Sequence, residues 1–298
     1  MAGNADRLPG GYWDSVGVLH REFELSVLTG RDEELLSQAD RAETASLVTA
    51  VLSRAVRKIG NISPVTEELA RQLLVADRQF LLMKLRQRTF GDLVRADLFC
   101  PWAGCGRRAS MEFKIGDLPV EEATQLSPLY SMFLSRTALD EEDASRREVT
   151  FRLPTGADQE AVSSLLATNE AEALSLLLRR TIQRIGSCDF PSGKQITELS
   201  SIARAEIEAE MERVAPRVEL NLETSCPECG RAFLVPFDIH RFFFGELRTD
   251  LNLLYQQVHY LAYHYHWGES EIMTMPGNKR QKYIELLAGE IERLNHGA

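Results

Sequence analysis

The chain has 298 residues, of which 44% are hydrophobic and 26% are charged, and its formal net charge is −10. This is the composition of a globular protein with room for about two domains. The acidic balance argues against a nucleic-acid binder, which needs a basic surface to follow phosphates. No apolar run approaches the ~20 residues of a membrane span, and the first residues lack the apolar core of a signal peptide. We therefore expect a cytoplasmic protein whose thiols stay reduced.

A six-residue motif, Thr-Gly-x-Asp-x-Glu, occurs twice, each time after a strand-like stretch. Residues 23–27 precede the first hexad, Thr29–Glu34, and residues 149–153 precede the second hexad, Thr155–Glu160. The two hexads are 126 positions apart (155 − 29). A threonine followed by acidic residues is typical of the first turn of a helix, where it caps the backbone. Because no nucleophile or base accompanies these acids, we expect no catalytic role for them.

A helix is predicted after each hexad. Apolar residues at helical spacing span 47–59 and end before Gly60, and the same spacing spans 174–185 and ends before Gly186. Apolar side chains three and four residues apart form a stripe that packs on a core, and a glycine often follows the last helical turn. The two glycines are again 126 positions apart.

A second helical region follows in each half of the chain. Residues 65–89 carry apolar side chains at helical spacing, and we predict a break near Asp77, whose carboxylate would cap the second part. Residues 196–214 show the same spacing. Strand-like alternation then surrounds a Cys-Pro…Cys-Gly turn in both places, which predicts two β-hairpins with cysteines at their tips.

The cysteines of these turns are the most specific signal in the sequence. Cys100 and Cys226 are 126 positions apart, whereas Cys105 and Cys229 are 124 apart because the first turn has two more residues between its cysteines. Two short-spaced pairs supply the four thiolates of a tetrahedral, structural zinc site. We predict one zinc ion, with each hairpin giving half of the site; the alternative is a set of free thiols. Cys188 has no partner and is expected to be a small buried or loop thiol.

These matches in register predict that an ancestral unit was duplicated. The expected fold is α+β, with two related strand-helix-helix-hairpin repeats that share a four-cysteine, zinc-ribbon-like site, followed by a helical extension. The first repeat is placed at 12–118, the second at 148–239 and the C-terminal extension at 240–296. Residues 119–147 are expected to be a linker with an exposed acidic run at Asp140–Asp143.

The C-terminal extension has no counterpart in the first half. Its sequence predicts a long helix, a break at Trp267-Gly268, a short helix before Pro276 and a closing helix. Its aromatic residues and histidines either pack in a core or form a docking surface, since Tyr and Trp dominate binding sites. The spacing of its histidines does not fit a metal pair. The residues that would form the partner surface are Phe243, Phe244, Tyr255, Tyr263, His264, His266 and Trp267.

Several short motifs occur in an order that resembles a known family. They are residues 77–82, 85–86 and 89–92, which lead into Cys100 and Cys105-Gly106, and then residues 152–160, 226–230, 264–267, 271–272, Arg280, Tyr283 and 286–287. Over residues 20–290 the chain is similar to baseplate hub assembly chaperones and baseplate proteins of T-even-like contractile phages. The clearest likeness is to the long forms associated with extracellular contractile injection systems. That family has Cys-x-x-Cys where this chain has four residues between Cys100 and Cys105.

The resemblance implies a non-enzymatic protein that acts in the assembly of a contractile phage-tail-like particle, with baseplate or hub proteins as partners. We expect an assembly chaperone that holds a baseplate or hub subunit before that subunit joins its neighbours. One alternative is a permanent structural component of the baseplate. The cysteine pattern also leaves open a zinc-ribbon nucleic-acid-binding protein, against which the acidic charge argues.

Overall fold

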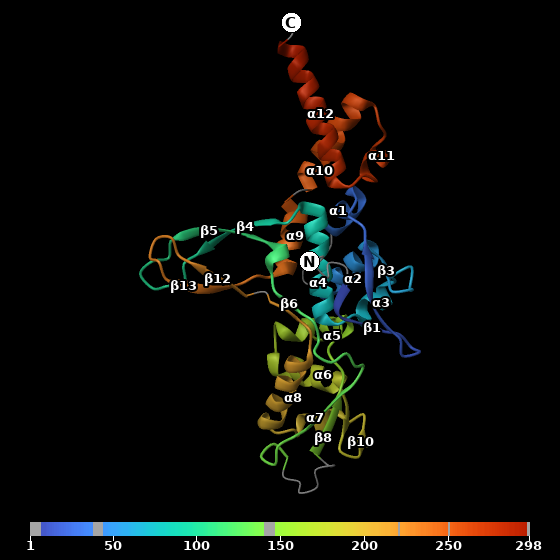
Figure 1. Cartoon of the computed structure of the whole chain (residues 1–298), viewed down its shortest axis with the longest axis vertical. Coiled ribbons are helices and arrows are strands. Elements are labelled where there is room, and N and C mark those ends of the chain that lie inside the picture. The colour runs from blue at the N-terminus through green and yellow to red at the C-terminus, as the bar shows by residue number, and fades with distance from the viewer. Residues whose placement is uncertain (1–6, 38–43, 140–146, 220, 250, 297–298) are drawn as a thin grey trace.

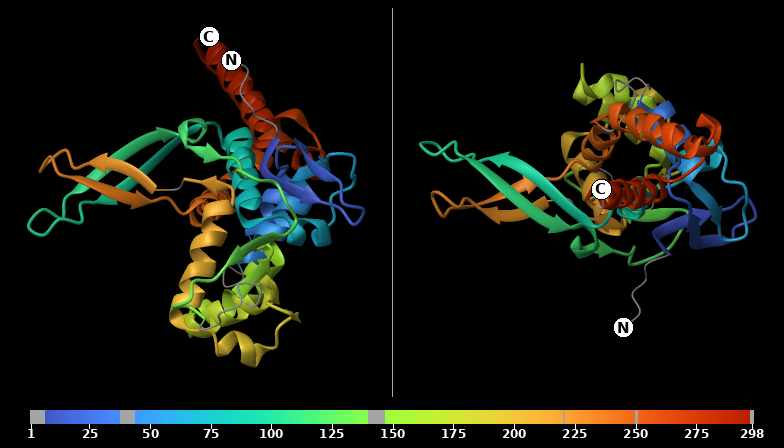
Figure 2. Two further views of the ribbon diagram at one scale, coloured as in Figure 1. Left: turned by 60° about the horizontal axis from the view of Figure 1, so that its bottom comes forward. Right: turned by 90° about the horizontal axis from the view of Figure 1, so that it is seen from above.

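The computed structural model describes residues 7–37, 44–139, 147–219, 221–249 and 251–296. Helices and small antiparallel sheets are mixed along the chain, so the fold class is α+β. The molecule is elongated, and three bodies follow one another along its long axis: the C-terminal helices, the first half and the second half (Figure 1). Two hairpins project sideways from the middle as a long arm, which Figure 2 shows from two further sides.

The first half is built around a three-stranded antiparallel sheet with strand order β1-β2-β3. The α2 and α4 helices pack on each other, and α4 also lies beside β1. Sheet and helices therefore enclose one hydrophobic core. The elements of this half are β1 (Arg7–Trp13), β2 (Leu19–Leu25), α1 (Gly30–Ser37), α2 (Thr44–Ala55), β3 (Val56–Ile59), α3 (Glu67–Gln72) and α4 (Val75–Phe90).

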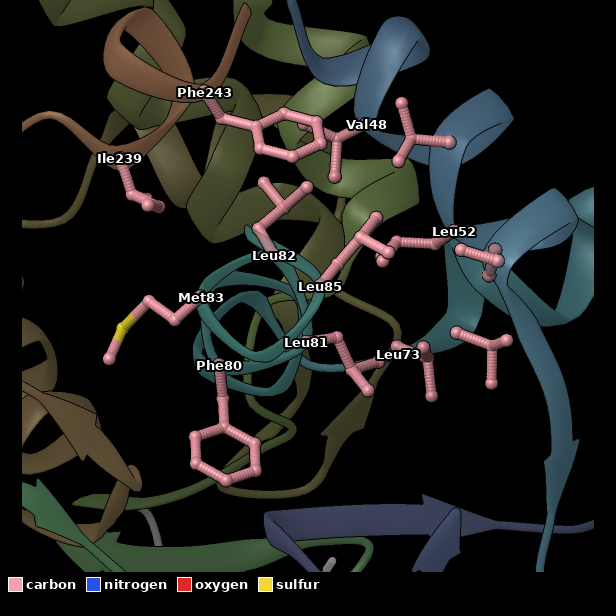
Figure 3. Packing of buried hydrophobic residues seen from close by; sticks show 14 of the residues in the cluster. Val48, Leu52, Leu73, Phe80, Leu81, Leu82, Met83, Leu85, Ile239 and Phe243 are labelled. Atoms are coloured by element: carbon pink, nitrogen blue, oxygen red, sulfur yellow. The ribbon is translucent and has the colours of Figure 1, made fainter. Parts of the chain in front are cut away.

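The α4 helix runs through the centre of this core. Five buried side chains point in different directions from its axis and each is at most 5% exposed: Phe80, Leu81, Leu82, Met83 and Leu85 (Figure 3). Apolar residues can surround this helix because neighbours cover its sides, among them α2, β1 and α9 (Ile239–Thr249). Burial of one leucine side chain stabilises a fold by about 2 kcal/mol, so α4 is a main source of stability for this half.

The second half is built around a four-stranded antiparallel sheet with strand order β10-β9-β8-β7. A second core, distinct from the first, contains Phe151, Leu178 and Ile207 among its buried residues. The elements of this half are β7 (Tyr130–Phe133), β8 (Glu148–Phe151), α5 (Gly156–Leu166), α6 (Glu170–Thr181), β9 (Ile182–Ile185), β10 (Cys188–Asp189), α7 (Gly193–Thr197) and α8 (Ser201–Val214).

Each half leads into one hairpin of the arm. The hairpin strands are β4 (Leu93–Phe99) with β5 (Arg108–Lys114), and β12 (Asn221–Ser225) with β13 (Ala232–Pro236). After β5 comes the short 3-10 helix η2 (Ile115–Asp117), and at the base of the arm β6 (Val120–Glu121) pairs with β11 (Arg217–Val218). Among the side chains whose burial is described in the four hairpin strands, only Val94 is buried. The arm therefore has almost no hydrophobic core of its own.

Helices close the chain as predicted, with breaks at Trp267-Gly268 and before Pro276. After α9 come α10 (Leu251–Tyr265), α11 (Glu269–Met273) and α12 (Gly277–His296), and these three form a third, small core. The α1 helix contacts α9, α10 and α11. The extension is thus seated on the first half, at the end opposite the second half (Figure 1).

Two predicted helices end earlier than their apolar spacing indicates. The α2 helix ends at Ala55 and α6 ends at Thr181, and the following residues form β3 and β9. Val and Ile fit the helical stripe here, but they also favour strands, and β3 pairs with β2 as β9 pairs with β8. The helical prediction for residues 56–59 and 182–185 was therefore wrong.

The predicted break near Asp77 is also misplaced. The α4 helix begins at Val75, so Asp77 lies inside its first turn. The Asp77 carboxylate instead accepts hydrogen bonds from the amides of Gly10 and Gly11, both at 2.8 Å. Burial raises the pKa of Asp77 to about 6, although these two amides act in the opposite direction. This carboxylate therefore fixes β1 to the start of α4 instead of capping a helix.

The stretch 119–147, expected to be a linker, supplies two strands. It contains β6 and β7, and it buries Tyr130 and Leu134 in the second core. The predicted acidic run Asp140–Asp143 lies outside the described residues. The part from Tyr130 onwards belongs to the second half, because β7 is the edge strand of the four-stranded sheet. Val120 instead packs against the first core, and the amide of Ala123 donates to the carbonyl of Pro9 at 3.2 Å.

Several elements of the second half begin at a constant spacing from elements of the first half. Five pairs of elements begin 126 positions apart: α1 and α5, α2 and α6, β3 and β9, α3 and α7, and α4 and α8. Gly60 and Gly186 both have a positive φ, 55° and 54°, a conformation that favours glycine. Each donates its amide, at 2.7 Å, to a glutamate carbonyl, and these two residues, Glu22 and Glu148, are also 126 positions apart.

Candidate metal centre at the tips of the hairpins

Both hairpin turns hold their first cysteine in the same way. In the β4–β5 turn the amide of Cys100 donates to the carbonyl of Arg107 at 2.9 Å. In the β12–β13 turn the amide of Cys226 donates to the carbonyl of Arg231 at 3.0 Å. In each turn the acceptor is the second residue after the second cysteine. The strands therefore bring the two cysteines of a turn together whether two or four residues separate them.

Glycines complete both turns. Gly106 and Gly230 directly follow the second cysteines and have positive φ values of 56° and 70°. The longer first turn also has Gly104 at a φ of 85°. Residues with a side chain rarely adopt this conformation, so the Cys-Gly pairs in the sequence reflect a need of the backbone.

The four sulfur atoms form one cluster across the two hairpins. Sγ of Cys100 lies 3.8 Å from Sγ of Cys229, and Sγ of Cys105 lies 3.7 Å from Sγ of Cys226. All four atoms lie within 4.8 Å of one another, and all four cysteines are free thiols. Sulfurs arranged tetrahedrally at about 2.3 Å from a zinc ion are about 3.8 Å apart. The cysteines therefore fit a tetrahedral metal ion, with one pair from each hairpin.

The cluster lies where other contacts between the hairpins are weak. Trp102 Nε1 donates to the carbonyl of Ala232 at 3.2 Å, and the Arg231 guanidinium lies 5.7 Å from the centre of the Trp102 ring. Both contacts are exposed, and contacts of this kind contribute about 1 kcal/mol or less. The cysteine cluster is thus the strongest candidate for holding the two tips together.

The surroundings shift the pKa values of two of the thiols in opposite directions. Hydrogen bonds from the amides of Cys229 and Glu228 lower the pKa of Cys226 to about 7. Burial raises the pKa of Cys100 to about 12. Metals bind the thiolate, so a bound cation would have to offset the burial of Cys100.

The remaining candidate ligands lie elsewhere. Among the described residues, the four-cysteine cluster is the only group of three or more His, Cys, Asp or Glu side chains placed to hold a metal ion. Cys188 lies in β10 and is half-buried. Among the described residues, His259, His264 and His266 belong to no such group.

The expected partner surface is partly core. Phe243 and Phe244 are 0% and 6% exposed and belong to the first core, because α9 packs this face against α4. The docking interpretation is therefore wrong for these two residues. Trp267 is half-buried and stacks on Tyr265, with 4.7 Å between the ring centres. Four predicted contact residues are exposed: Tyr255, Tyr263, His264 and His266.

Each hexad binds the start of a helix elsewhere in the chain, which sequence reasoning missed. The amide of Gly156 in the second hexad donates to the carbonyl of Leu73 at 3.0 Å, just before α4. The amide of Gly30 in the first hexad donates to the carbonyl of Met275 at 3.2 Å, just before α12. The second hexad therefore joins the two halves, and the first hexad joins the first half to the extension.

A buried arginine follows each of these helix starts. Arg78 in α4 and Arg280 in α12 are 1% and 2% exposed, and each is the fifth residue after the carbonyl that accepts the glycine amide. Arg280 Nη2 pairs with Glu33 of the first hexad at 2.6 Å. An Arg-Gln pair at both places is the signal that could have linked the two helices.

The arginines explain why each hexad contains glycine. A Cβ atom added to Gly156 would lie 2.1 Å from Nη1 of Arg78, and one added to Gly30 would lie 3.0 Å from Nη1 of Arg280. Because both arginines are buried and hydrogen-bonded, they have little space to move away.

Comparison with known protein families matches residues 18–244 to the family described as T4 bacteriophage base plate protein. The matched segment contains both hexads and the whole arm. Comparison with curated proteins and with solved structures gave no match. No helix of the described residues is both long and apolar enough to cross a membrane. Since the family match spans well over half of the sequence, the chain belongs to the T4 bacteriophage base plate protein family.

Proposed function

We propose that this chain is a non-enzymatic assembly factor for the baseplate or hub of a contractile phage-tail-like particle, clamped by a structural zinc ion. The observation that carries the proposal is the cluster of four sulfurs that two hairpins form inside the segment matched to the base plate family. The particle would be of the kind found in extracellular contractile injection systems, as the resemblance of the sequence implies. Its partners are other baseplate or hub proteins.

Zinc is the metal that suits the ligand set. Cys100, Cys105, Cys226 and Cys229 supply four thiolates and fill a tetrahedral shell, so no position remains for a reacting water. When bound, the ion would cross-link the two hairpins and add directly to folding stability. The near absence of a hydrophobic core in the arm gives this cross-link a clear structural role.

Duplication of one ancestral unit accounts for the parallel construction. The common spacing of 126 relates the hexads, the starts of five element pairs, the two positive-φ glycines and the first cysteines of both turns. Each copy then contributes one hairpin, and half of the metal site. Repeats at 12–118 and 148–239, with an extension at 240–296, describe this arrangement.

The partner surface lies on the extension. Tyr255, Tyr263, His264 and His266 are exposed on or just after α10, and tyrosine is common in the centres of binding interfaces. The net charge of −10 would keep the free protein soluble before it meets a subunit.

Elemental analysis of the purified protein tests the metal centre. We expect about one zinc per chain, in keeping with one tetrahedral site made of four cysteines. Replacing Cys226 and Cys229 together by serine should abolish zinc binding, whereas the matched control Cys188→Ser should retain it. Metal-free protein whose cysteines all react with a thiol reagent would overturn the zinc proposal.

Mass spectrometry of purified particles tests the role in assembly. An assembly chaperone is absent from mature particles, yet particles should fail to form without it. The second candidate function, a permanent component of the baseplate, is favoured by the description of the matched family and requires a fixed number of copies in every particle. Normal particles from cells that lack the protein would contradict both.

A further inference from the structure

The helix starts that receive the hexads share one pattern of contacts. Before α4, the carbonyl of Leu73 accepts from Gly156, and the amide of Val75 donates to the carbonyl of Pro154 at 3.2 Å. Before α12, the carbonyl of Met275 accepts from Gly30 and also from Nη1 of Arg280, at 2.6 Å. Each helix start therefore offers backbone groups and a buried arginine to a Thr-Gly turn.

The second half contains a third helix start of the same kind, residues 199–204. Arg204 is 126 positions after Arg78, and both make equivalent hydrogen bonds. Nη1 of Arg78 donates to Thr49 at 2.9 Å and to the Ala70 carbonyl at 2.8 Å. Arg204 donates to Ser175 at 2.9 Å and to the Ile196 carbonyl at 3.0 Å, and these acceptors are again 126 positions after their counterparts.

Within the described part of the chain, no Thr-Gly turn covers this third helix start. Ser200 and Ser201 are exposed, the Ile202 side chain is 48% exposed, and Arg204 is only half-buried, whereas Arg78 is 1% exposed beneath the second hexad. The second half, which carries it, is the end of the molecule farthest from the C-terminal helices (Figure 1). A hexad of the first half thus binds the extension, and a hexad of the second half binds the first half. The corresponding helix start of the second half, residues 199–204, receives no such hexad from the described residues.

We propose that residues 199–204 bind a Thr-Gly or Ser-Gly turn, placed between a strand and an acidic helix start, on another protein of the particle. The proposal rests on the duplication and on the assembly role proposed above. The amide of Ser201 would donate to the carbonyl before the threonine or serine, and the carbonyl of Leu199 would accept from the glycine. Leu199 already accepts from Nε of Arg204 at 3.3 Å, which is no obstacle, because the Met275 carbonyl accepts both bonds at once.

The charge of Arg204 and the space beside it determine which turn could bind at residues 199–204. Arg204 would face an acidic residue of the incoming turn, as Arg280 faces Glu33. The residue after the threonine or serine must be glycine, because Arg204 stands where Arg78 leaves no space for a Cβ beside Gly156. A second copy of this chain does not supply the turn, since both of its own hexads are already bound.

A peptide tests the chemistry of the site. The probe is a fluorescent synthetic peptide with the sequence of residues 149–166, which contains the second hexad, added to the full-length zinc-loaded protein. We expect saturable binding by fluorescence anisotropy. The same peptide with Gly156→Leu should bind at least tenfold more weakly. Absence of binding, or equal binding of the two peptides, would overturn the proposal.

A proline at the first position of α8 removes one donor without breaking the helix. Proline is favoured at this position, and the preceding Ser200 has the extended backbone that proline requires. Ser201→Pro should weaken peptide binding at least fivefold, whereas Ala209→Gln, exposed on the same helix, should leave it unchanged. Equal affinity of Ser201→Pro and wild type, with both folded by circular dichroism, would refute the predicted bond.

A photo-crosslinking residue in place of Ile202 identifies the occupant in producing cells. The crosslinked segment should be a Thr-Gly or Ser-Gly turn between a strand and a helix in a different protein. Crosslinks to a second copy of this chain, or to segments without such a turn, would overturn the proposal. Zinc content and particle composition are measured in separate experiments. If the peptide and crosslinking tests fail, the proposed function still stands; if the zinc or particle analysis fails, the peptide result can still be interpreted.

Discussion

The two hexads have the same sequence pattern but different surroundings. In both, the amide of the threonine donates to the aspartate carboxylate, at 3.0 Å for Asp32 and 2.9 Å for Asp158. Asp32 is 21% exposed, and its nearest cation, Arg54, lies 3.8 Å away. Asp158 is 0% exposed and accepts from Arg152 at 2.6 Å and from Arg180 at 2.7 Å.

The difference shows that the same sequence motif can have a different structural importance at two places in one chain. Arg54 and Arg180 occupy matching positions, 126 apart, but Arg152 matches Ser26, which has no charge. The second hexad lies between the two halves and its carboxylate is buried, so it needs a second arginine. The Asp32 carboxylate of the first hexad is partly exposed, so one arginine at 3.8 Å is enough.

The largest expected effect comes from removing the buried carboxylate. Asp158→Ala leaves two arginines without their partner and should lower the free energy of unfolding by about 3 kcal/mol. Asp32→Ala removes a partly exposed hydrogen-bond acceptor and should cost about 1 kcal/mol. Urea denaturation of the two variants measures the difference. Equal losses would show that the two turns stabilise the fold equally.

A smaller loss of stability is expected when the glycine of each hexad is replaced by alanine. Gly156→Ala should destabilise the protein by about 2 kcal/mol, because the new methyl group overlaps the buried guanidinium of Arg78. Gly30→Ala should cost about 1 kcal/mol, because its contact with Arg280 is longer. Thermal unfolding of the pair checks the order, and the reverse order would contradict the tighter packing at the second hexad.

Protonation of Asp158 should contribute to the loss of stability at acid pH. Burial alone would raise its pKa, but hydrogen bonds from Arg152 and from the Thr155 amide outweigh burial and hold it at about 2, below the ordinary 3.8. Its stabilising contribution is therefore complete above pH 4 and is lost as the pH falls towards 2. Over the first pH unit of this fall, the loss should be about 1 kcal/mol.

Asp77 acts in the opposite direction. Its pKa is raised to about 6, so its contribution is complete below pH 4 and is lost as the pH rises through 6. Urea titrations between pH 2 and 7 should therefore flatten below pH 4 in Asp158→Asn and between pH 4 and 6 in Asp77→Asn. Asp32→Asn serves as the control, and an acid slope unchanged by Asp158→Asn would exclude the assignment.

The smallest expected effect concerns the last residue of each hexad. Glu34 accepts a hydrogen bond from the Tyr255 hydroxyl, whereas Glu160 accepts from Thr49 and pairs with Arg71 at 2.9 Å. Tyr255→Phe removes one exposed hydrogen bond and should cost about 0.5 kcal/mol by urea denaturation. A loss above about 2 kcal/mol would mean that the first hexad is anchored as strongly as the second.

The sequence predicts features that depend on near neighbours. The cysteine-tipped hairpins follow from alternation around Cys100 and Cys226, and the breaks of the extension follow from glycine and proline. Residues 56–59 and 182–185 were misassigned because their apolar spacing suits both helix and strand, and only the neighbouring strands β2 and β8 decide.

Long-range contacts are what local patterns could not supply. Gly30 and Met275 meet across most of the chain, and no local pattern near either one indicates the other. The meeting of all four sulfurs was predicted from the two short-spaced cysteine pairs, together with the hypothesis of a duplication that would pair the tips. The burial of Phe243 and Phe244 likewise depends on α4, which lies far away in the sequence.

The contact between Gly30 and Met275 determines how early this part of the protein can fold during synthesis on the ribosome. Gly30 emerges 245 residues before Met275 (275 − 30), which at about 5–20 residues per second is a wait on the order of tens of seconds. Leu73, by contrast, has already been translated when Gly156 appears. The contact between Gly156 and Leu73 can therefore form during translation, whereas the contact between Gly30 and Met275 forms only after Met275 has been made. Formation of that contact thus reports that the segment around Met275 and Arg280 has been synthesised.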